Sequence, residues 1–143
     1  MSDWSKFESA NPELMQALGG MRVLEVDRQA GSALLAFECL PAFCHSGGST
    51  AQGGFVTAWL DAAMAHAVIL TADEPVNVAS LDINVRFLER VAPGPVHALG
   101  RIVRRGRRVV FLEARLMRPD GSLLASASSS GMLVPGPPPS GSH

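Results

Sequence analysis

The stretch of sequence that decides the fold runs from Cys44 to Leu70 and reads CHSGGSTAQGGFVTAWLDAAMAHAVIL. It opens as a loop of small residues and continues as an apolar run, which predicts a helix over about residues 54–71. Because this helix is apolar on all sides, we expect other elements to bury it. Asp61 interrupts the run, and a carboxylate taken out of water is costly unless it is paired. We therefore interpret Asp61 as a functional group; the alternative is a structural carboxylate held by hydrogen bonds.

The composition indicates one domain with an ordinary core. The chain has 143 residues, of which 47% are hydrophobic, and a formal net charge of -1 that gives no overall bias toward nucleic acid. Two cysteines do not make a disulfide framework, and the N-terminal residues lack the apolar segment of a signal peptide. We therefore expect a cytoplasmic protein that neither enters a membrane nor binds nucleic acid.

Periodicity predicts the elements on either side of the central helix. A short helix over about residues 11–18, capped by Asn11, precedes a hairpin, and a period of two marks four strands after the central helix. We expect these four strands to form a meander, with residues 1–134 as a single domain and residues 135–143 as a disordered tail rich in proline, glycine and serine. The predicted hairpin strands are residues 21–27 and 32–39, and the later strands are 78–88, 96–103, 108–117 and 123–134.

Alternation is clearest in the first strand after the helix. Over residues 78–88, one face carries Ala79, Leu81, Ile83, Val85 and Phe87, and the other carries Ser80, Asp82, Asn84 and Arg86. A sheet built from such strands needs one face covered, and the apolar helix can cover it. The predicted fold class is α+β, with an antiparallel sheet of five or six strands wrapped around one long central helix.

Several of these motifs together resemble the hotdog-fold acyl-CoA thioesterases, in the branch of the phenylacetate-pathway and 4-hydroxybenzoyl-CoA thioesterases. That branch carries His-Gly-Gly, followed on the central helix by Leu-x-Asp-x-Ala. Here the matching run is QGGFVTAWLDAA over residues 52–63, with the same spacing from Gln52 to Asp61. Residues 78–85 and the Arg-rich turn at 104–107 resemble the later strands of that family. The sequence departs from the family at Gln52, where the family has His, and at Ser46, where it often has Asn.

The chemistry of thioester hydrolysis gives the positions that match the family motif their roles. Free N–H groups at a helix start can stabilise a developing oxyanion, so we expect the Gly53 N–H to polarise the carbonyl, with Gln52 beside it and Gly54 leaving room for the substrate. Asp61 would be the nucleophile or the general base. Ser80 resembles a family hydroxyl that orients water or the carboxylate. Small residues at a loop-to-helix joint also have an ordinary explanation in packing.

The resemblance implies further features of substrate and assembly. The family builds its site across a dimer interface, with the glycines from one chain and the helix Asp from its partner, and it commonly forms tetramers. The arginines at the 104–107 turn (Arg104, Arg105 and Arg107) would meet the phosphates of coenzyme A, for which arginine geometry is suited, and Ser46 and Gly54 would complete substrate binding. Coenzyme A is then part of the substrate, and no separate cofactor or metal is expected.

Other functions fit parts of the sequence. A hotdog dehydratase or hydratase needs a His in the site loop, which Gln52 does not supply but His45 does. A non-catalytic acyl-CoA-binding module would share the fold without turnover. The His and Cys residues fit no zinc spacing, and residues 48–53 have the spacing of a phosphate-binding loop but lack its lysine.

Overall fold

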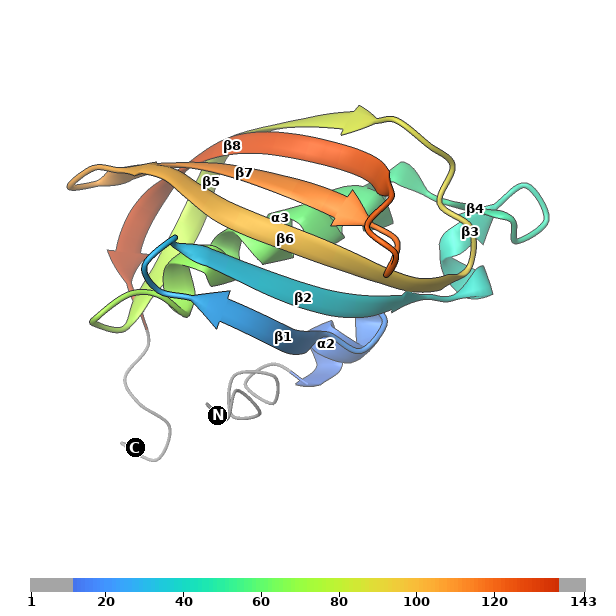
Figure 1. Cartoon of the computed structure of the whole chain (residues 1–143), viewed down its shortest axis with the longest axis horizontal. Coiled ribbons are helices and arrows are strands. Elements are labelled where there is room, and N and C mark those ends of the chain that lie inside the picture. Colours follow the sequence, from blue (N-terminus) through green and yellow to red (C-terminus); the bar gives the residue numbers. More distant parts are fainter. Residues whose placement is uncertain (1–11, 137–143) are drawn as a thin grey trace.

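The computed structural model describes residues 12–136, so the predicted cap Asn11 and most of the predicted tail lie outside the described part. The long helix α3 (Gly53–Ile69) runs through the molecule along the sheet (Figure 1). The other helical elements are the short α2 (Pro12–Ala17) and the 3-10 turn η1 (Pro41–Phe43). The strands are β1 (Arg22–Asp27), β2 (Ser32–Cys39), β3 (Cys44–His45), β4 (Thr50–Ala51), β5 (Val76–Phe87), β6 (Gly94–Arg105), β7 (Val109–Met117) and β8 (Leu123–Pro135).

The main sheet is antiparallel and six-stranded, in the order β1-β2-β6-β7-β8-β5. The predicted hairpin β1-β2 is confirmed, but the predicted four-stranded meander is wrong, because only β6, β7 and β8 follow one another. β5 lies at the edge beside β8, and β6 pairs instead with β2. The six residues between β5 and β6 therefore cross one end of the sheet instead of making a tight hairpin. The last strand also extends to Pro135, which was predicted to begin the tail.

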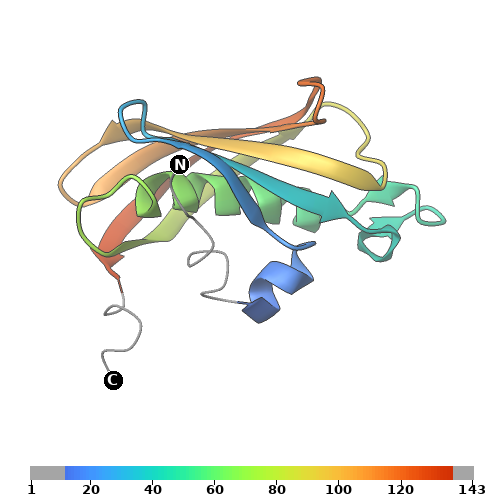
Figure 2. The same cartoon turned by 60° about the horizontal axis from the view of Figure 1, so that its bottom comes forward.

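The sheet curves over one side of α3 (Figure 2). Gly100 of β6 sets the depth of this packing, because a Cβ at that position would lie 2.7 Å from the Met64 backbone N and closer still to the Ala63 carbonyl. Trp59 on the same buried side has no exposed surface, and its Nε1–H donates to the Leu18 carbonyl oxygen at 2.7 Å, which ties the end of α2 to the helix.

The opposite side of α3 is not covered by the described chain. The helix residues that are exposed or only half-buried recur at intervals of three or four and form one stripe along its length. The prediction of a helix buried on all sides is therefore wrong for a single chain. The middle of the stripe consists of Gly54, Ala58, Asp61, Ala62, Ala65 and Ile69, and the half-buried Thr57 and His66 flank it.

A β-bulge in β5 changes which residues point toward the core, from the even-numbered to the odd-numbered ones. The pairing with β8 shifts between Ser80, opposite Gly131, and Asp82, opposite Ser130, so Leu81 is the extra residue. Half-buried positions accordingly fall at even numbers before the bulge and at odd numbers after it. The uniform alternation predicted for residues 78–88 is wrong in its first half: Leu81 is 55% exposed, and Ser80 turns toward α3.

Asp82 fastens the strand just after the bulge. Its carboxylate accepts hydrogen bonds from the backbone N–H and the hydroxyl of Ser130, each at 2.7 Å, and these bonds hold the pKa of Asp82 below its usual range. The Ser129 hydroxyl donates to the Asp82 carbonyl oxygen at 2.7 Å. The register of β5 against β8, and with it the orientation of Ser80, is thus fixed by side chains as well as by the ladder.

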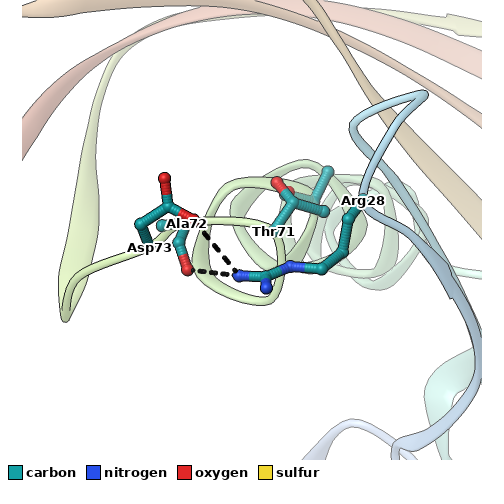
Figure 3. A network of polar contacts seen from close by, with 5 residues as sticks. Arg28, Thr71, Ala72 and Asp73 are labelled. Carbon is teal, nitrogen blue, oxygen red and sulfur yellow. Dashed lines mark hydrogen bonds and ion pairs between the residues drawn. The ribbon is translucent and has the colours of Figure 1, made fainter.

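The C-terminal end of α3 is tied to the turn between β1 and β2. Arg28 in that turn donates to the Ala72 carbonyl oxygen at 2.9 Å and lies 3.8 Å from the Asp73 carboxylate (Figure 3). Thr71 closes the helix end, since its hydroxyl donates to the Ala67 carbonyl oxygen. The C-terminal end of the helix is therefore anchored to the turn between β1 and β2.

Candidate functional site

The start of α3 presents one backbone donor that the described residues leave free. Gln52 caps the helix in an extended conformation, and its side-chain Oε1 accepts from the Gly54 N–H at 2.7 Å. The Phe55 N–H donates to the Gln52 carbonyl oxygen at 2.9 Å. Among the described residues no acceptor faces the Gly53 N–H. This free donor lies at the positive end of the helix dipole, where an anion or a developing oxyanion is stabilised.

The two glycines at this point also leave little room for a side chain. A Cβ on Gly53 would lie 3.3 Å from the ring of Phe87, and a Cβ on Gly54 would lie 2.7 Å from the Gln52 Oε1. A side chain at position 54 would thus displace the amide that caps the helix. The same absence of side chains leaves the Gly53 N–H open to a ligand.

The Asp61 carboxylate lies half-buried on the uncovered stripe of α3. The Ser80 hydroxyl donates to its Oδ1 at 3.2 Å, across from the edge strand β5. The contact depends on the bulge at Leu81, because regular alternation would turn Ser80 away from the helix. No Arg or Lys of the described residues forms an ion pair with Asp61. The structure thus brings together two of the predicted site residues, Asp61 and Ser80.

Gly53 and Asp61 are not brought together within one chain. Eight residues of α-helix separate them, which corresponds to about 12 Å along the axis. A group that attacks a carbonyl carbon must lie about 3–3.5 Å from it, and a donor to its oxygen must be equally close. One thioester cannot satisfy both groups of a single chain.

The loop before α3 has an unusual backbone. Ser46 has a φ of 55°, a conformation uncommon for residues other than glycine, and Gly47 and Gly48 follow with φ of 73° and 83°. The Ser46 hydroxyl lies 2.8 Å from Nδ1 of His45, and the Ser46 carbonyl oxygen accepts from the Ser49 hydroxyl. The hydroxyl predicted to bind substrate therefore engages a neighbouring imidazole.

A pocket of about 430 Å³ lies beside the helix start and includes Gly53 in its wall. Its lining is mostly apolar and also includes His45, Glu89 and Arg90. His45 was predicted to matter only in a hydratase, and its position beside Gly53 was not predicted. The signal for it in the sequence is that it directly precedes Ser46, a predicted substrate-binding residue. The aromatic residues that are most buried, such as Trp59, belong to the core and not to this pocket. The apolar lining consists of Ala51, Val56, Phe87, Leu88, Val91 and Ala125.

The predicted phosphate-binding arginines lie at the other end of the molecule. Arg104, Arg105 and Arg107 are exposed at the β6–β7 turn, and the β3–β4 loop beside Gly53 lies at the opposite end of the sheet (Figure 1). Arg104 and Arg107 border a depression of about 680 Å³ on that turn. Within one chain, therefore, these arginines and Gly53 cannot serve one short ligand.

The remaining titratable groups have local partners. Nδ1 of His66 lies 2.7 Å from the Ala62 carbonyl oxygen, and burial lowers the pKa of this imidazole. The thiols of Cys39 and Cys44 lie 3.8 Å apart, and burial, followed by the contact with Cys44, raises the pKa of Cys39 to about 12. Between residues 12 and 136, the side chains of metal-binding type do not gather in groups of three or more, and no helix is long and apolar enough to cross a membrane.

Comparison with known proteins now bears on this site. A protein of Saccharolobus solfataricus that carries the name esterase is 26% identical over 109 residues, covering 76% of each chain. The structure of a phenylacetic acid degradation-related protein from Ralstonia eutropha is 29% identical with a TM-score of 0.79, covering 90% of this chain and 97% of the other. A mutant of the phenylacetic acid degradation protein PaaI from Thermus thermophilus is 25% identical with a TM-score of 0.70, covering 84% and 97%.

The sequence profile of the thioesterase superfamily matches residues 48–125. This match begins in the loop before α3 and ends in β8, so it contains the helix start, Asp61 and Ser80. It confirms the predicted hotdog fold, and together with the PaaI-type structures it confirms the predicted resemblance to the phenylacetate branch. The chain belongs to the thioesterase superfamily.

Proposed function

We propose that the protein hydrolyses acyl-CoA thioesters to the free acid and coenzyme A, in a site that two copies of the chain share. One observation carries this proposal: α3 presents a free N–H at Gly53 and a carboxylate at Asp61, about 12 Å apart on the same helix. Both groups suit thioester hydrolysis, but only a second chain can bring a Gly53 to an Asp61.

The edge strand β5 offers the surface for that second chain. It is 12 residues long and pairs with β8 on one side only, so its other side is free for an added strand. Leu81 and Phe87 on β5 are 55% and 58% exposed. Two copies of β5 paired antiparallel about a twofold axis would extend the sheet across the dimer and bury this edge.

The contacts within one chain specify the register that such a dimer needs. Asp61 lies against Ser80, and Gly53 lies against Phe87. A partner's Gly53 reaches Asp61 if Ser80 lies near Phe87 of the partner subunit, which centres the pairing between Ile83 and Asn84. The partner's helix start then covers part of the stripe that the sheet leaves open.

Each group has a defined part in the reaction. The Gly53 N–H binds the thioester oxygen as charge develops on it. The Gln52 side chain stands beside it, and because its Oε1 is held by Gly54, its NH₂ is the group that can donate to the substrate. Asp61, oriented by Ser80, either attacks the carbonyl carbon or removes a proton from water. Transfer of the acyl group to water releases the thiol of coenzyme A.

The Arg104–Arg107 turn is proposed to bind the phosphates of the same substrate. An antiparallel partner would bring its own turn toward the Gly53 end of this chain, which the single chain keeps far away. Arginine side chains pair bidentately with phosphate. Coenzyme A is thereby part of the substrate and no other cofactor takes part; pairing of two such dimers into a tetramer is the assembly that we propose for the whole enzyme.

The decisive comparison is between a variant that removes the Gly53 N–H and one that keeps it. Gly53→Pro removes this N–H at the first helical position, where proline is tolerated, and the extended Gln52 (ψ 139°) suits a residue before proline. Gly53→Ala is the matched control, because it adds the same Cβ near Phe87 but keeps the N–H. Thiol release from phenylacetyl-CoA, butyryl-CoA and octanoyl-CoA is measured for both.

We expect Gly53→Pro to lower kcat by about 10²–10³-fold, the loss typical of one oxyanion donor, and Gly53→Ala to lower it far less. Equal losses in the two variants would mean that the N–H takes no part. A parent enzyme that binds these acyl-CoAs by calorimetry but releases no thiol would be a binding module. Hydration of crotonyl-CoA in place of thiol release would identify a hydratase.

A further inference from the structure

We propose that His45 is a catalytic residue of this chain, which protonates the departing thiolate sulfur, and that Ser46 is its positioning residue. This inference rests on the proposed thioester hydrolysis and adds a proton donor to it. The observation behind it is the position of an imidazole. Gln52 at the helix start cannot donate a proton to the leaving group, but the imidazole of His45 lies in the wall of the same pocket as Gly53.

Gln52 cannot carry a proton through the reaction. Its amide does not titrate near neutral pH, and its oxygen is engaged by the Gly54 N–H at 2.7 Å. Expulsion of an alkyl thiolate leaves a basic sulfur, and an acid that protonates it speeds its departure. The described pocket offers few groups for this task, since the other titratable residues in its lining are Glu89 and Arg90.

The backbone holds His45 at this pocket. The pairing of β3 with β4 places His45 opposite Thr50. Two further backbone hydrogen bonds lie beside this pair: the Gln52 N–H donates to the Phe43 carbonyl oxygen at 2.9 Å, and the Ala51 N–H donates to the Val91 carbonyl oxygen at 2.8 Å. Because these bonds join the His45 strand to the residue that caps α3, the imidazole and the Gly53 N–H keep a fixed relation. Figure 1 shows this small ladder beside the start of the helix.

Ser46 orients the ring. Its hydroxyl lies 2.8 Å from Nδ1, so Nε2 is the ring nitrogen that is left for a substrate. Ser46 holds this position at a φ of 55°, a conformation in which glycine would be less strained. Strained residues that persist are often found at functional sites, and here the serine side chain gives a reason for the strain.

The proton transfer balances in the following way. As the C–S bond of the thioester breaks, its electron pair stays on sulfur, and the proton on Nε2 of the imidazolium moves to that sulfur to give the free thiol. The acyl carbon keeps the oxygen delivered through Asp61. The proton that this water loses leaves to solvent, and a proton from solvent restores the imidazolium, so that thioester and water give acid and thiol. Three other titratable groups lie near the imidazole. Glu89 and Arg90 line the same pocket and carry opposite charges, and Cys44 precedes His45 on the same strand.

The test compares His45→Gln with the parent on two thioesters of one acid. The first is the acyl-CoA of the panel that the parent hydrolyses fastest, and the second is the S-phenyl thioester of the same acid, whose thiophenol leaves without help from an acid. We expect His45→Gln to lower kcat for the CoA ester by about 10²-fold with KM nearly unchanged, and to lower it much less for the phenyl ester. His97→Gln, which removes an imidazole from β6 away from the pocket, is the matched control.

The pH profile gives a second readout. The protonated imidazole is the active form, so kcat of the parent for the CoA ester should fall toward alkaline pH, and this fall should be absent in His45→Gln. Ser46→Gly relieves the strained backbone and removes the hydroxyl, so it should keep the fold while lowering kcat several-fold.

Equal losses on the two esters, or an unchanged pH profile in His45→Gln, would overturn this role of His45 while leaving the proposed hydrolysis intact. A parent that hydrolyses no acyl-CoA of the panel would overturn the proposed function and this inference together. Loss of activity in Ser46→Gly accompanied by unfolding would assign the strained loop a structural role and contradict the positioning role.

Discussion

Gly100 is the position where the packing of the central helix on the sheet can be tested most sharply. In Gly100→Ala the new Cβ would lie 2.7 Å from the Met64 N, about 1 Å inside ordinary contact distance, and closer still to the Ala63 carbonyl. These are backbone atoms in the middle of α3, so no side-chain rotation relieves the clash. The helix must move away from β6 or the strand must distort.

Gly131→Ala is the control for this substitution. It also adds a methyl group inside the sheet, but the atom it meets is the end of the Val78 side chain, and the next atom, the Ala79 carbonyl oxygen, is at an ordinary 3.5 Å. A rotation of Val78 off its preferred angle costs about 1 kcal/mol. Overpacking against backbone costs about 3 kcal/mol or more.

Thermal unfolding of the two variants measures the difference. For a chain of this length 1 kcal/mol corresponds to about 3–4 °C, so Gly100→Ala should lower Tm by about 10 °C and Gly131→Ala by about 3 °C. Circular dichroism at a fixed protein concentration follows both, because a dimer makes Tm depend on concentration. If Gly100→Ala unfolds at the same temperature as Gly131→Ala, the close packing of α3 on β6 described above is wrong.

Three further outcomes follow from single contacts. Burial lowers the pKa of His66, so the unfolded chain binds the proton more tightly than the folded chain does. The free energy of unfolding, measured by urea titration, should therefore fall as pH drops below about 6.5 in the parent and fall less in His66→Gln. Because burial raises the pKa of Cys39 to about 12, a maleimide reagent should label Cys44 in the folded protein and Cys39 only after unfolding, as mass spectrometry of the peptides would show. Removing the hydroxyl in Ser80→Ala frees the Asp61 carboxylate and should lower kcat about tenfold with little change in Tm, whereas Ser128→Ala, at an exposed position of β8, should leave kcat unchanged.

Much of the fold could be predicted from the spacing of apolar residues along the chain, because helices and strands each bury side chains at a fixed spacing. The apolar run that contains Asp61 predicted a long helix, and the helix extends over Gly53–Ile69; the alternating stretches predicted strands whose bounds differ by a few residues. The position of β5 did not follow, because strand order depends on pairing across the sheet, and nothing local distinguishes a neighbour of β6 from a neighbour of β8. The uncovered stripe of α3 was not predicted for a related reason. An apolar composition indicates that a helix is buried, but it does not indicate whether its own chain or another chain buries it.

For the candidate site, the sequence predicted how far apart two residues lie when both belong to the same helix. Gly53 and Asp61 lie where the helix periodicity put them. The contact between Ser80 and Asp61 required the bulge at Leu81, which the sequence does not signal, since its residues alternate regularly through that point. His45 reaches the same pocket as Gly53 only through the short pairing of β3 with β4, a contact between residues that lie in a loop of small side chains.

Each proposed active site takes Gly53 from one chain and Asp61 from another. Mixing Gly53→Pro and Asp61→Asn subunits, after denaturing and refolding them together, tests it directly by thiol release. In a mixed dimer one of the two sites has both groups intact, so random pairing predicts recovery of about a quarter of the parent rate from two variants that are each inactive alone. If the refolded mixture is no more active than its separate components, the two groups do not belong to one shared site.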